Sequence, residues 1–434
     1  MSQFVHSVSL KSEKCAGCTH CVKSCPTEAI RVKDSKAYIN SDRCIDCGEC
    51  IRICPTSAKY AVYDPISVIE EYKYKIALPA PALYGQFDNL DDTDYILNGL
   101  LKCGFDSVYE VARAAEYITE FTRAYLKKPG IKKPVISSAC PVICRLISAR
   151  FPLLRDNVLP LLPPVELAAK IARARAKKEH PELKDSDIGV FFISPCPAKV
   201  SYIKQPIGIE KSSVDAVLAI EQIYKKLVSA MRSTDELKPL RQSGRTGISW
   251  AGTGGEASAI YNSKYLAADG VKNAIKVLEE IENENISGLE FVELNACHGG
   301  CFGGTLTVEN PYIAKARLHN LRRYLPVSSV DFKCENFDDI PNENMWTNSL
   351  SWSRVMQLSE DRDKAMQMLS SIQKMCEQLP GLDCGACGAP TCKAHAEDVV
   401  TGKSKETDCL FIMKEKINEI YKSFGAIASG GGDD

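Results

Sequence analysis

The sequence predicts a modular protein in which a central α/β domain lies between two short cysteine-rich domains. Three observations predict this organisation. Two tandem cysteine motifs occupy the first 60 residues, apolar runs alternate with amphipathic stretches over about residues 71–350, and four further cysteines follow residue 380. At 434 residues, the chain is long enough for two to four domains with cores of their own.

The composition narrows the class of protein. Lys and Arg total 54 against 55 for Asp and Glu, so the net charge of −1 gives no reason to expect nucleic acid or a membrane surface as a partner. No window approaches the roughly 18 apolar residues of a membrane span, and the first residues lack the apolar core of a signal peptide. We therefore expect a cytoplasmic protein. In that reducing compartment, 20 cysteines indicate metal ligation and not a disulfide framework.

The first domain, residues 1–70, contains the motifs CAGCTHCVKSCP and CIDCGECIRICP. Both follow C-x2-C-x2-C-x3-C-P, the spacing of bacterial-type ferredoxins, in which the fourth cysteine of each motif ligates the other 4Fe-4S cluster. We expect the first cluster on Cys15, Cys18, Cys21 and Cys54, and the second on Cys44, Cys47, Cys50 and Cys25. A pair of zinc knuckles is the alternative, which two tandem motifs with both prolines disfavour.

The second domain, residues 71–350, is the predicted α/β domain. Apolar runs such as VISSACP, IGVFFISPCP and LEFVELNACHGG alternate with helical stretches such as VELAAKIARARAKK and VKNAIKVLEEIENE. Each run is expected to be a strand that ends in a cysteine-bearing loop, where ligands of α/β proteins usually bind. The loop cysteines are Cys140, Cys196, Cys297 and Cys301. Each alone could be a small buried hydrophobe, whereas all four together would suit a third cubane.

These loops resemble the signature of the FeFe hydrogenases, which usually read Thr-Ser-Cys-Cys-Pro, Met-Pro-Cys-Thr-x-Lys and Glu-x-Met-Ala-Cys-Pro-Gly-Gly-Cys-x-Gly-Gly. Here they read SSACP, SPCPAK and ELNACHGGCFGG. The resemblance covers about residues 10–335 and implies an α/β hydrogenase-like catalytic domain, an N-terminal bacterial ferredoxin-like α+β domain and a small C-terminal iron-sulfur domain.

The resemblance also implies the H-cluster, a 4Fe-4S cubane linked to a diiron subsite with CO, CN and dithiolate ligands. By this match, Cys140, Cys196 and Cys297 bind the cubane, and Cys301 bridges it to the diiron subsite. Lys199 matches the lysine that donates a hydrogen bond to a cyanide, with a surface lysine as the alternative.

Departures from the family pattern fall on its proton route. Ala139 stands where the family has the cysteine that relays protons, and a methyl group cannot carry a proton. Ser194 and Asn295 replace the two methionines, His298 replaces the proline after the third cysteine, and Tyr202 replaces an expected glutamate. The usual proton route is therefore predicted to be absent.

A substitute route is expected, because electrons delivered to a buried site without protons would leave uncompensated charge in a low dielectric. Glu256 in AGTGGEAS is the first candidate, and a glutamate that only starts a helix is the alternative. His298 is the second candidate, as a proton carrier or as a group that tunes the cubane. With Lys199, these residues form the predicted catalytic set. Cys144 is expected to be a core residue.

Residues 351–380 are predicted to form a connecting helix, because apolar residues recur at helical spacing. These residues are Val355, Met356, Met366, Leu369, Ile372 and Met375.

Residues 381–434 are predicted to form the C-terminal 4Fe-4S domain with a final helix. The spacing C-x2-C-x4-C-x16-C resembles the small cluster domain of corrinoid proteins and electron-transfer subunits, and zinc is the alternative. The predicted ligands are Cys384, Cys387, Cys392 and Cys409. His395 is expected to face solvent. The remaining cysteines, Cys103, Cys334 and Cys376, are expected to be structural thiols.

The resemblance implies reversible H2/proton chemistry. With Ala139 and cluster domains at both ends, the chain resembles the branch of the family assigned to H2 sensing, so we expect a slow enzyme. Clusters on both sides of the catalytic domain suggest one electron path in and a second path out, toward a redox partner protein or ferredoxin. Hydrogenase maturation proteins would load the diiron subsite. The oligomeric state, a homodimer included, is left open.

Two other functions fit the same residues. The first is a productive, ferredoxin-linked hydrogenase with a different proton path. The second is a hydrogenase-like iron-sulfur assembly protein without the diiron subsite, a family that also tends to read Ser-Ala-Cys-Pro in its first loop. The twin ferredoxin motifs and the C-terminal cysteine cluster disfavour the assembly protein.

Overall fold

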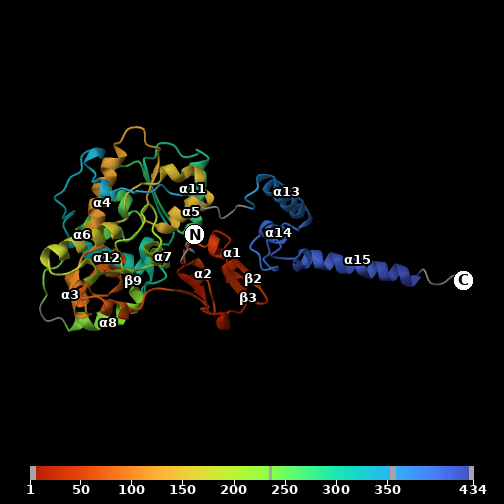
Figure 1. Ribbon diagram of the computed structural model, residues 1–434, viewed down its shortest axis with the longest axis horizontal. Coiled ribbons are helices and arrows are strands. Elements are labelled where there is room, and N and C mark those ends of the chain that lie inside the picture. Colours follow the sequence, from red (N-terminus) through yellow and green to blue (C-terminus); the bar gives the residue numbers. More distant parts are fainter. Residues whose placement is uncertain (1–5, 234–236, 352–357, 430–434) are drawn as a thin grey trace. The chain divides into compact units, whose positions relative to one another are not determined.

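The computed structural model describes residues 6–233, 237–351 and 358–429, with the backbone alone for residues 423–429 (Figure 1). The chain divides into two compact units. Unit 1 consists of Met1–Val8, Ile45–Gly48 and Ala61–Ser353, and unit 2 of Ser9–Cys44, Glu49–Tyr60 and Arg354–Asp434. Among the described residues, no helix combines the length and the apolar character that crossing a membrane requires.

The described residues of unit 1 form two parallel sheets. The first has the strand order β6-β5-β8-β9 and the second has the order β10-β11-β7. The strands of the first are β5 (Tyr74–Pro79), β6 (Ser107–Val108), β8 (Ile188–Ser194) and β9 (Ala216–Ala219). Those of the second are β7 (Val135–Ile136), β10 (Tyr265–Asp269) and β11 (Phe291–Asn295). The three apolar runs quoted from the sequence form β7, β8 and β11, which confirms the α/β prediction.

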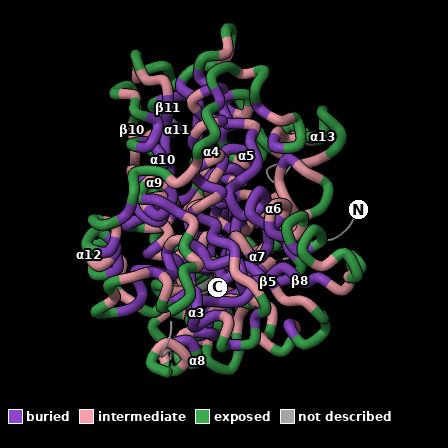
Figure 2. The backbone as a smooth tube through the Cα atoms, turned by 90° about the vertical axis from the view of Figure 1, so that its left-hand side faces the viewer, coloured by how far each residue is buried: buried purple, intermediate pink, exposed green. Residues whose placement is uncertain are grey.

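The first sheet is buried on both faces, which explains why IGVFFIS is apolar without alternation. Val190 and Phe192 face one hydrophobic cluster, with residues of α4 and α6, while Phe191 and Ile193 face another, with residues of α3 and α8. Successive side chains of a strand point to opposite faces, so β8 takes part in both cores. Figure 2 shows this buried backbone running through β5 and β8.

Helices surround both sheets, and four of them begin with proline, which is preorganised for the first helical position. They are α3 (Asp94–Lys102), α4 (Val111–Leu126), α5 (Pro141–Arg150), α6 (Pro164–Glu179), α7 (Pro197–Lys204), α8 (Ile220–Arg232), α9 (Arg245–Ser249), α10 (Gly255–Ala259), α11 (Val271–Glu282) and α12 (Pro311–Leu321). The two amphipathic stretches quoted from the sequence form α6 and α11.

Unit 2 combines the N-terminal and the C-terminal cysteine-rich segments. The N-terminal segment is an α+β arrangement, as predicted, with two short helices and two two-stranded sheets. Its elements are β1 (Val8–Leu10), α1 (His20–Ser24), β2 (Ile30–Lys33), β3 (Lys36–Ile39), α2 (Glu49–Arg52) and β4 (Lys59–Ala61). The C-terminal segment is helical, with α13 (Arg362–Gln378), α14 (Cys392–Val400) and α15 (Leu410–Ser429), drawn in blue in Figure 1.

The predicted connecting helix is shorter than the sequence pattern suggested. It begins at Arg362, because the Asp361 side chain accepts hydrogen bonds from the backbone N–H groups of Asp363 and Lys364 and caps the helix. Ile372 and Met375 pack into a hydrophobic cluster with residues of α14 and α15, so α13 is part of unit 2. Met366 and Leu369 are exposed, and Val355 and Met356 lie outside the described residues.

Candidate metal centres and catalytic cavity

Loops at the carboxyl ends of β7, β8 and β11 bring four distant cysteines of unit 1 to one cavity. Cys140 precedes α5, Cys196 precedes α7, Cys297 follows β11, and Cys301 lies in the turn Gly300–Gly303. All four thiols line the cavity, at the edge of the sheets where α/β proteins bind ligands. The structure thus places together the four cysteines that the sequence assigns to one cluster.

Glycines allow the third loop to close against the second. A Cβ atom at Gly304 would lie 2.1 Å from the carbonyl oxygen of Pro195, the residue before Cys196. The same oxygen accepts a hydrogen bond of 3.0 Å from the Leu306 N–H group. A side chain at position 304 would therefore push the loops of Cys196 and Cys301 apart, which explains the need for glycine there.

The charges of the cavity suit bound thiolates. Burial raises the pKa of Cys196 and Cys301, while Lys199 acts in the opposite direction on both. Burial alone would lower the pKa of Lys199, but the neighbouring cysteine thiols together raise it above the ordinary value of lysine. A protonated lysine among thiolates offsets part of their negative charge in a low dielectric. The donor set therefore fits an anionic, multinuclear iron group, and Lys199 lines the cavity instead of lying on the surface.

Glu256 is a protonatable group in the wall of this cavity. It lies in α10, is 4% exposed, and accepts a hydrogen bond of 2.6 Å from the Ser137 hydroxyl. The same hydroxyl oxygen accepts a hydrogen bond of 3.2 Å from the Ala139 N–H group. Burial raises the pKa of Glu256, and the nearby Glu293 carboxylate raises it further. Glu256 is thus hydrogen-bonded to the loop that carries Ala139, and its environment favours the protonated form.

Glu293 is a cavity residue that the sequence reasoning missed. It lies on β11, is 3% exposed, and accepts hydrogen bonds from the N–H groups of Gly254 (2.9 Å) and Ala257 (2.8 Å) and from the Asn295 amide (2.8 Å). Burial raises its pKa. A glutamate inside the apolar run FVELN was the available signal, because a charge in a buried strand needs partners. Two neighbouring buried carboxyls are expected to share one proton.

His298 does not enter the cavity. Its side chain is 62% exposed, and its Nδ1 atom lies 3.4 Å from Asp269 Oδ1. Asn295 and Cys297 of the same loop line the cavity, whereas His298 is not among the described residues that line it. The geometry therefore gives no support to His298 as a direct proton relay. Cys144 is buried in the core, as predicted, and its thiol donates a weak hydrogen bond to the Ser138 carbonyl.

The cysteines of the first N-terminal set line a second, smaller cavity, which lies in unit 2. They are Cys15, Cys18, Cys21 and Cys54. Backbone N–H groups point at their sulfurs, including Ala37 to Cys15 (3.4 Å) and Ala58 to Cys54 (3.2 Å). Burial raises the pKa of Cys21, and the other three thiols of the set raise it further. These four residues are therefore close neighbours, as the crossed ferredoxin pattern requires.

The second N-terminal set comprises Cys25, Cys44, Cys50 and Cys47, of which Cys47 lies in unit 1. Burial raises the pKa of Cys50 to about 12, with a further contribution from Cys25. The buried Lys59 counteracts burial at both Cys21 and Cys50. Within unit 2, Cys50 thus lies near Cys25 of the other motif, which agrees with the crossed assignment. None of the 20 cysteines, all in described residues, forms a disulfide.

The C-terminal cysteines line a third cavity, together with a histidine. The cysteines are Cys384, Cys387, Cys392 and Cys409. His395 lines the same cavity and is 1% exposed, so the expectation that it faces solvent was wrong. It lies three residues after Cys392 on α14, and residues three apart share one face of a helix. Cys103 and Cys334 are buried, as expected of structural thiols, and Cys376 packs beside the α13–α14 core.

Replacing His395 by leucine is expected to lower the reduction potential of a C-terminal iron-sulfur cluster. Both ring nitrogens are buried and have no hydrogen-bond partner in the described part of the chain. A ring N–H directed at a cluster sulfur would stabilise the reduced, more negative state. A redox titration followed by electron paramagnetic resonance (EPR) measures the change. Cys376→Ala, in the same core, is the control, and equal potentials in both variants would contradict the expectation.

Three family profiles match the chain. The iron-only hydrogenase large subunit, C-terminal domain, matches residues 73–265 and 256–305. A 4Fe-4S dicluster domain matches residues 7–55, and an iron-sulfur cluster domain matches residues 379–411.

Individual proteins are more distant. The large subunit of the periplasmic Fe hydrogenase of Nitratidesulfovibrio vulgaris is 24% identical over 364 residues, which cover 69% of this chain and 86% of that protein. The uncharacterized protein MJ0119 of Methanocaldococcus jannaschii is 34% identical over 56 residues, 13% of this chain and 25% of that one. The solved FeFe hydrogenase HydA1 of Chlamydomonas reinhardtii is 16% identical with a TM-score of 0.46, and the match covers 60% of this chain and 86% of that one.

The hydrogenase profile spans more than half of the 434 residues and contains the four loop cysteines of the cavity, Cys140, Cys196, Cys297 and Cys301. The dicluster profile covers both N-terminal cysteine motifs up to Cys54. The chain therefore belongs to the iron-only (FeFe) hydrogenase large-subunit family and carries an N-terminal 4Fe-4S dicluster domain.

Proposed function

We propose that the protein is an FeFe hydrogenase with reversible H2/proton chemistry that turns over slowly and reports hydrogen to a redox partner. One observation carries this proposal. The four family cysteines and Lys199 line a single cavity, whereas the position that relays protons elsewhere in the family is the methyl group of Ala139. The cysteines and Lys199 in one cavity support the cofactor, and the methyl group of Ala139 supports the low rate of turnover.

The residues present fit the H-cluster. Cys140, Cys196 and Cys297 would hold its cubane, and Cys301 would bridge to the diiron subsite. Four cysteines from three loops and one lysine line this single cavity, a donor set larger than one ion requires. When bound, this cluster supplies the iron chemistry that splits or forms H2. With it, we propose one C-terminal and two N-terminal 4Fe-4S clusters.

We assign the relay of protons to the cavity to Glu256. Its carboxyl lines the cavity and accepts a hydrogen bond from Ser137, so it can hold a proton there and pass it inward. The carboxylate that remains would keep the hydrogen bond from Ser137 until it is protonated again. Glu293 keeps its charge satisfied through backbone N–H groups, and this neighbouring charge favours protonation of Glu256. A proton held this firmly is released slowly, which suits a sensor better than a productive enzyme.

The partner is proposed to be a redox protein or ferredoxin that accepts electrons from the iron-sulfur clusters, and maturation proteins are proposed to deliver the diiron subsite. We place the enzyme in the cytoplasm, where a reducing environment suits 20 cysteines without disulfides.

Infrared spectroscopy of the anaerobically matured full chain tests this function. Bands of metal-bound carbonyl and cyanide are expected, and they should disappear in Cys301→Ala while the iron of the other clusters remains. Absence of the bands after full maturation would contradict both hydrogenase functions and favour the assembly protein. High turnover together with the bands would instead favour the productive, ferredoxin-linked enzyme.

A further inference from the structure

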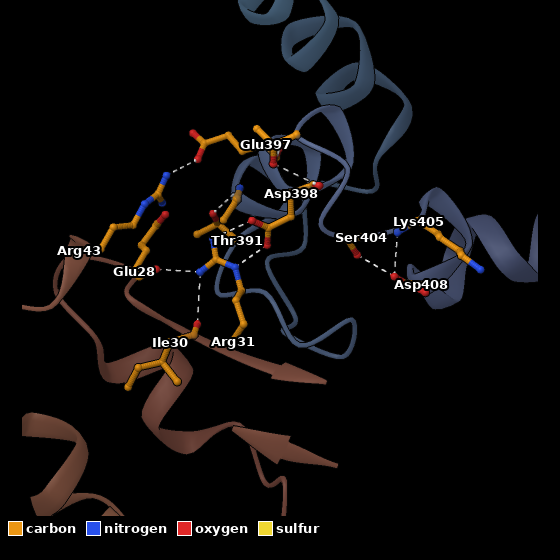
Figure 3. Close-up of polar contacts among 12 residues, drawn as sticks. Glu28, Ile30, Arg31, Arg43, Thr391, Glu397, Asp398, Ser404, Lys405 and Asp408 are labelled. Carbon is orange, nitrogen blue, oxygen red and sulfur yellow. Dashed lines mark hydrogen bonds and ion pairs between the residues drawn. The ribbon is translucent and has the colours of Figure 1, made fainter. Parts of the chain in front are cut away.

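Within the described part of unit 2, two ion pairs join the N-terminal and C-terminal segments (Figure 3). The Arg31 guanidinium donates from Nε and from Nη2 to the two carboxylate oxygens of Asp398, the second contact being 3.4 Å. Arg43 Nη2 lies 3.0 Å from Glu397 Oε2. All four side chains are at most 15% exposed, so these are shielded contacts and not surface pairs.

The backbone closes the same seam. The Val32 N–H group, on β2, donates a hydrogen bond of 3.0 Å to the Gly388 carbonyl. Gly388 has φ of +83°, and a Cβ atom there would lie 1.9 Å from the Val32 carbonyl oxygen. The two chain segments therefore touch without space for a side chain between them.

The seam is formed by the elements that carry the cysteines. Val32 lines the cavity of Cys15, Cys18, Cys21 and Cys54. Gly388 directly follows Cys387, which lines the C-terminal cavity, and Glu397 and Asp398 lie on α14, which begins at Cys392. The two cysteine cavities are thus adjacent across one backbone hydrogen bond.

We propose that Arg31 and Arg43 dock the C-terminal cluster against the first N-terminal cluster, so that the two clusters exchange electrons directly. This inference rests on the iron-sulfur clusters of the function proposed above. In each transfer, one cluster would be oxidised by one electron and the other would be reduced by it. Within unit 2, the C-terminal cluster would then be joined to the N-terminal clusters, whereas the sequence order suggested one electron path in and a separate path out.

The test uses the full chain with its 4Fe-4S clusters reconstituted and no diiron subsite. In the reduced protein, EPR is expected to show magnetic coupling between the first N-terminal and the C-terminal cluster. The double variant Arg31→Glu with Arg43→Glu is expected to lose this coupling at unchanged iron content. Adding Asp398→Arg and Glu397→Arg, which reverses both pairs, is expected to restore it. Arg52→Glu is the control, because the ion pair of Arg52 with Glu49 lies within the N-terminal segment.

Two outcomes would overturn the proposal: no coupling in the wild-type chain, or undiminished coupling in the double variant. If the double variant loses iron, its lost coupling is not informative, and the variant with all four substitutions is used instead. Recovery of the iron without recovery of the coupling in that variant would also overturn the proposal. Failure of the proposed function remains distinguishable. Missing carbonyl and cyanide bands would refute the hydrogenase chemistry, whereas the EPR coupling needs neither H2 nor the diiron subsite.

Discussion

Replacing Glu256 by glutamine is expected to lower H2 turnover about 10²-fold or more, the lower end of what a positioned acid or base contributes. Glutamine has nearly the same shape and can still accept the hydrogen bond from Ser137, but it cannot take up or release a proton. The loss therefore reports the proton and not the packing. Turnover with an artificial electron carrier measures it, while infrared bands confirm that the cofactor is loaded.

The pH profile is a second measure of the same change. Burial raises the pKa of Glu256, so the wild-type residue keeps its proton above the range in which an ordinary glutamate ionises. As the pH rises through this raised pKa, the proton is lost and H2 formation should slow. Glu256→Gln should lack this step, because its side chain does not titrate.

Glu166→Gln is the matched control. Glu166 is also buried, accepts hydrogen bonds from the Ser212 hydroxyl and the Ser213 N–H group (2.9 Å), and has a pKa raised by burial. Its neighbour Val165 lines the cavity, whereas Glu166 is not among the described residues that line it. This variant should keep near wild-type turnover. If both variants lose the same fraction of H2 turnover, the loss follows from replacing any buried carboxyl. Glu256 would then have no specific part in the proton route.

The sequence predicted the parts of this protein that depend on local spacing. Cysteines two or three residues apart must present their sulfurs to one region, so the crossed N-terminal sets followed from the motifs, and Cys21 indeed lies near Cys54. The apolar runs also identified β8 and β11, because a strand that is buried on both faces consists mostly of consecutive apolar residues.

Contacts between distant residues could not be predicted in this way. Arg31 and Asp398 are 367 positions apart, and nothing in either neighbourhood signals the other. His298 and His395 show the same limit, because both follow a cysteine of a predicted cluster within three residues. The first is exposed beside Asp269, while the second is buried and lines the C-terminal cavity. The sequence gives residue type and spacing, but the direction of a side chain depends on which element covers it.

Replacing Ala139 by cysteine is expected to raise H2 turnover about 10²-fold. Ala139 is half-buried and lines the cavity beside Cys140, so a thiol at this position would reach the space that a cofactor on the four cysteines occupies. An ordinary thiol has a pKa of about 8.5 and exchanges protons readily near neutral pH. The same electron carrier assay measures the gain, with infrared bands as the check on loading.

Ala139→Ser separates the proton from the added volume, because a hydroxyl is of similar size but does not ionise near neutral pH, and it should give little gain. The combination Ala139→Cys with Glu256→Gln is more informative. If Glu256 is the substitute relay for the missing thiol, the two groups act in parallel, and removing Glu256 should cost far less once Cys is present at position 139. An undiminished cost would place Glu256 in series with the thiol, as part of a route that the cysteine cannot replace. If Cys at position 139 changes H2 turnover neither in the wild-type chain nor in Glu256→Gln, proton delivery at this loop does not limit the enzyme.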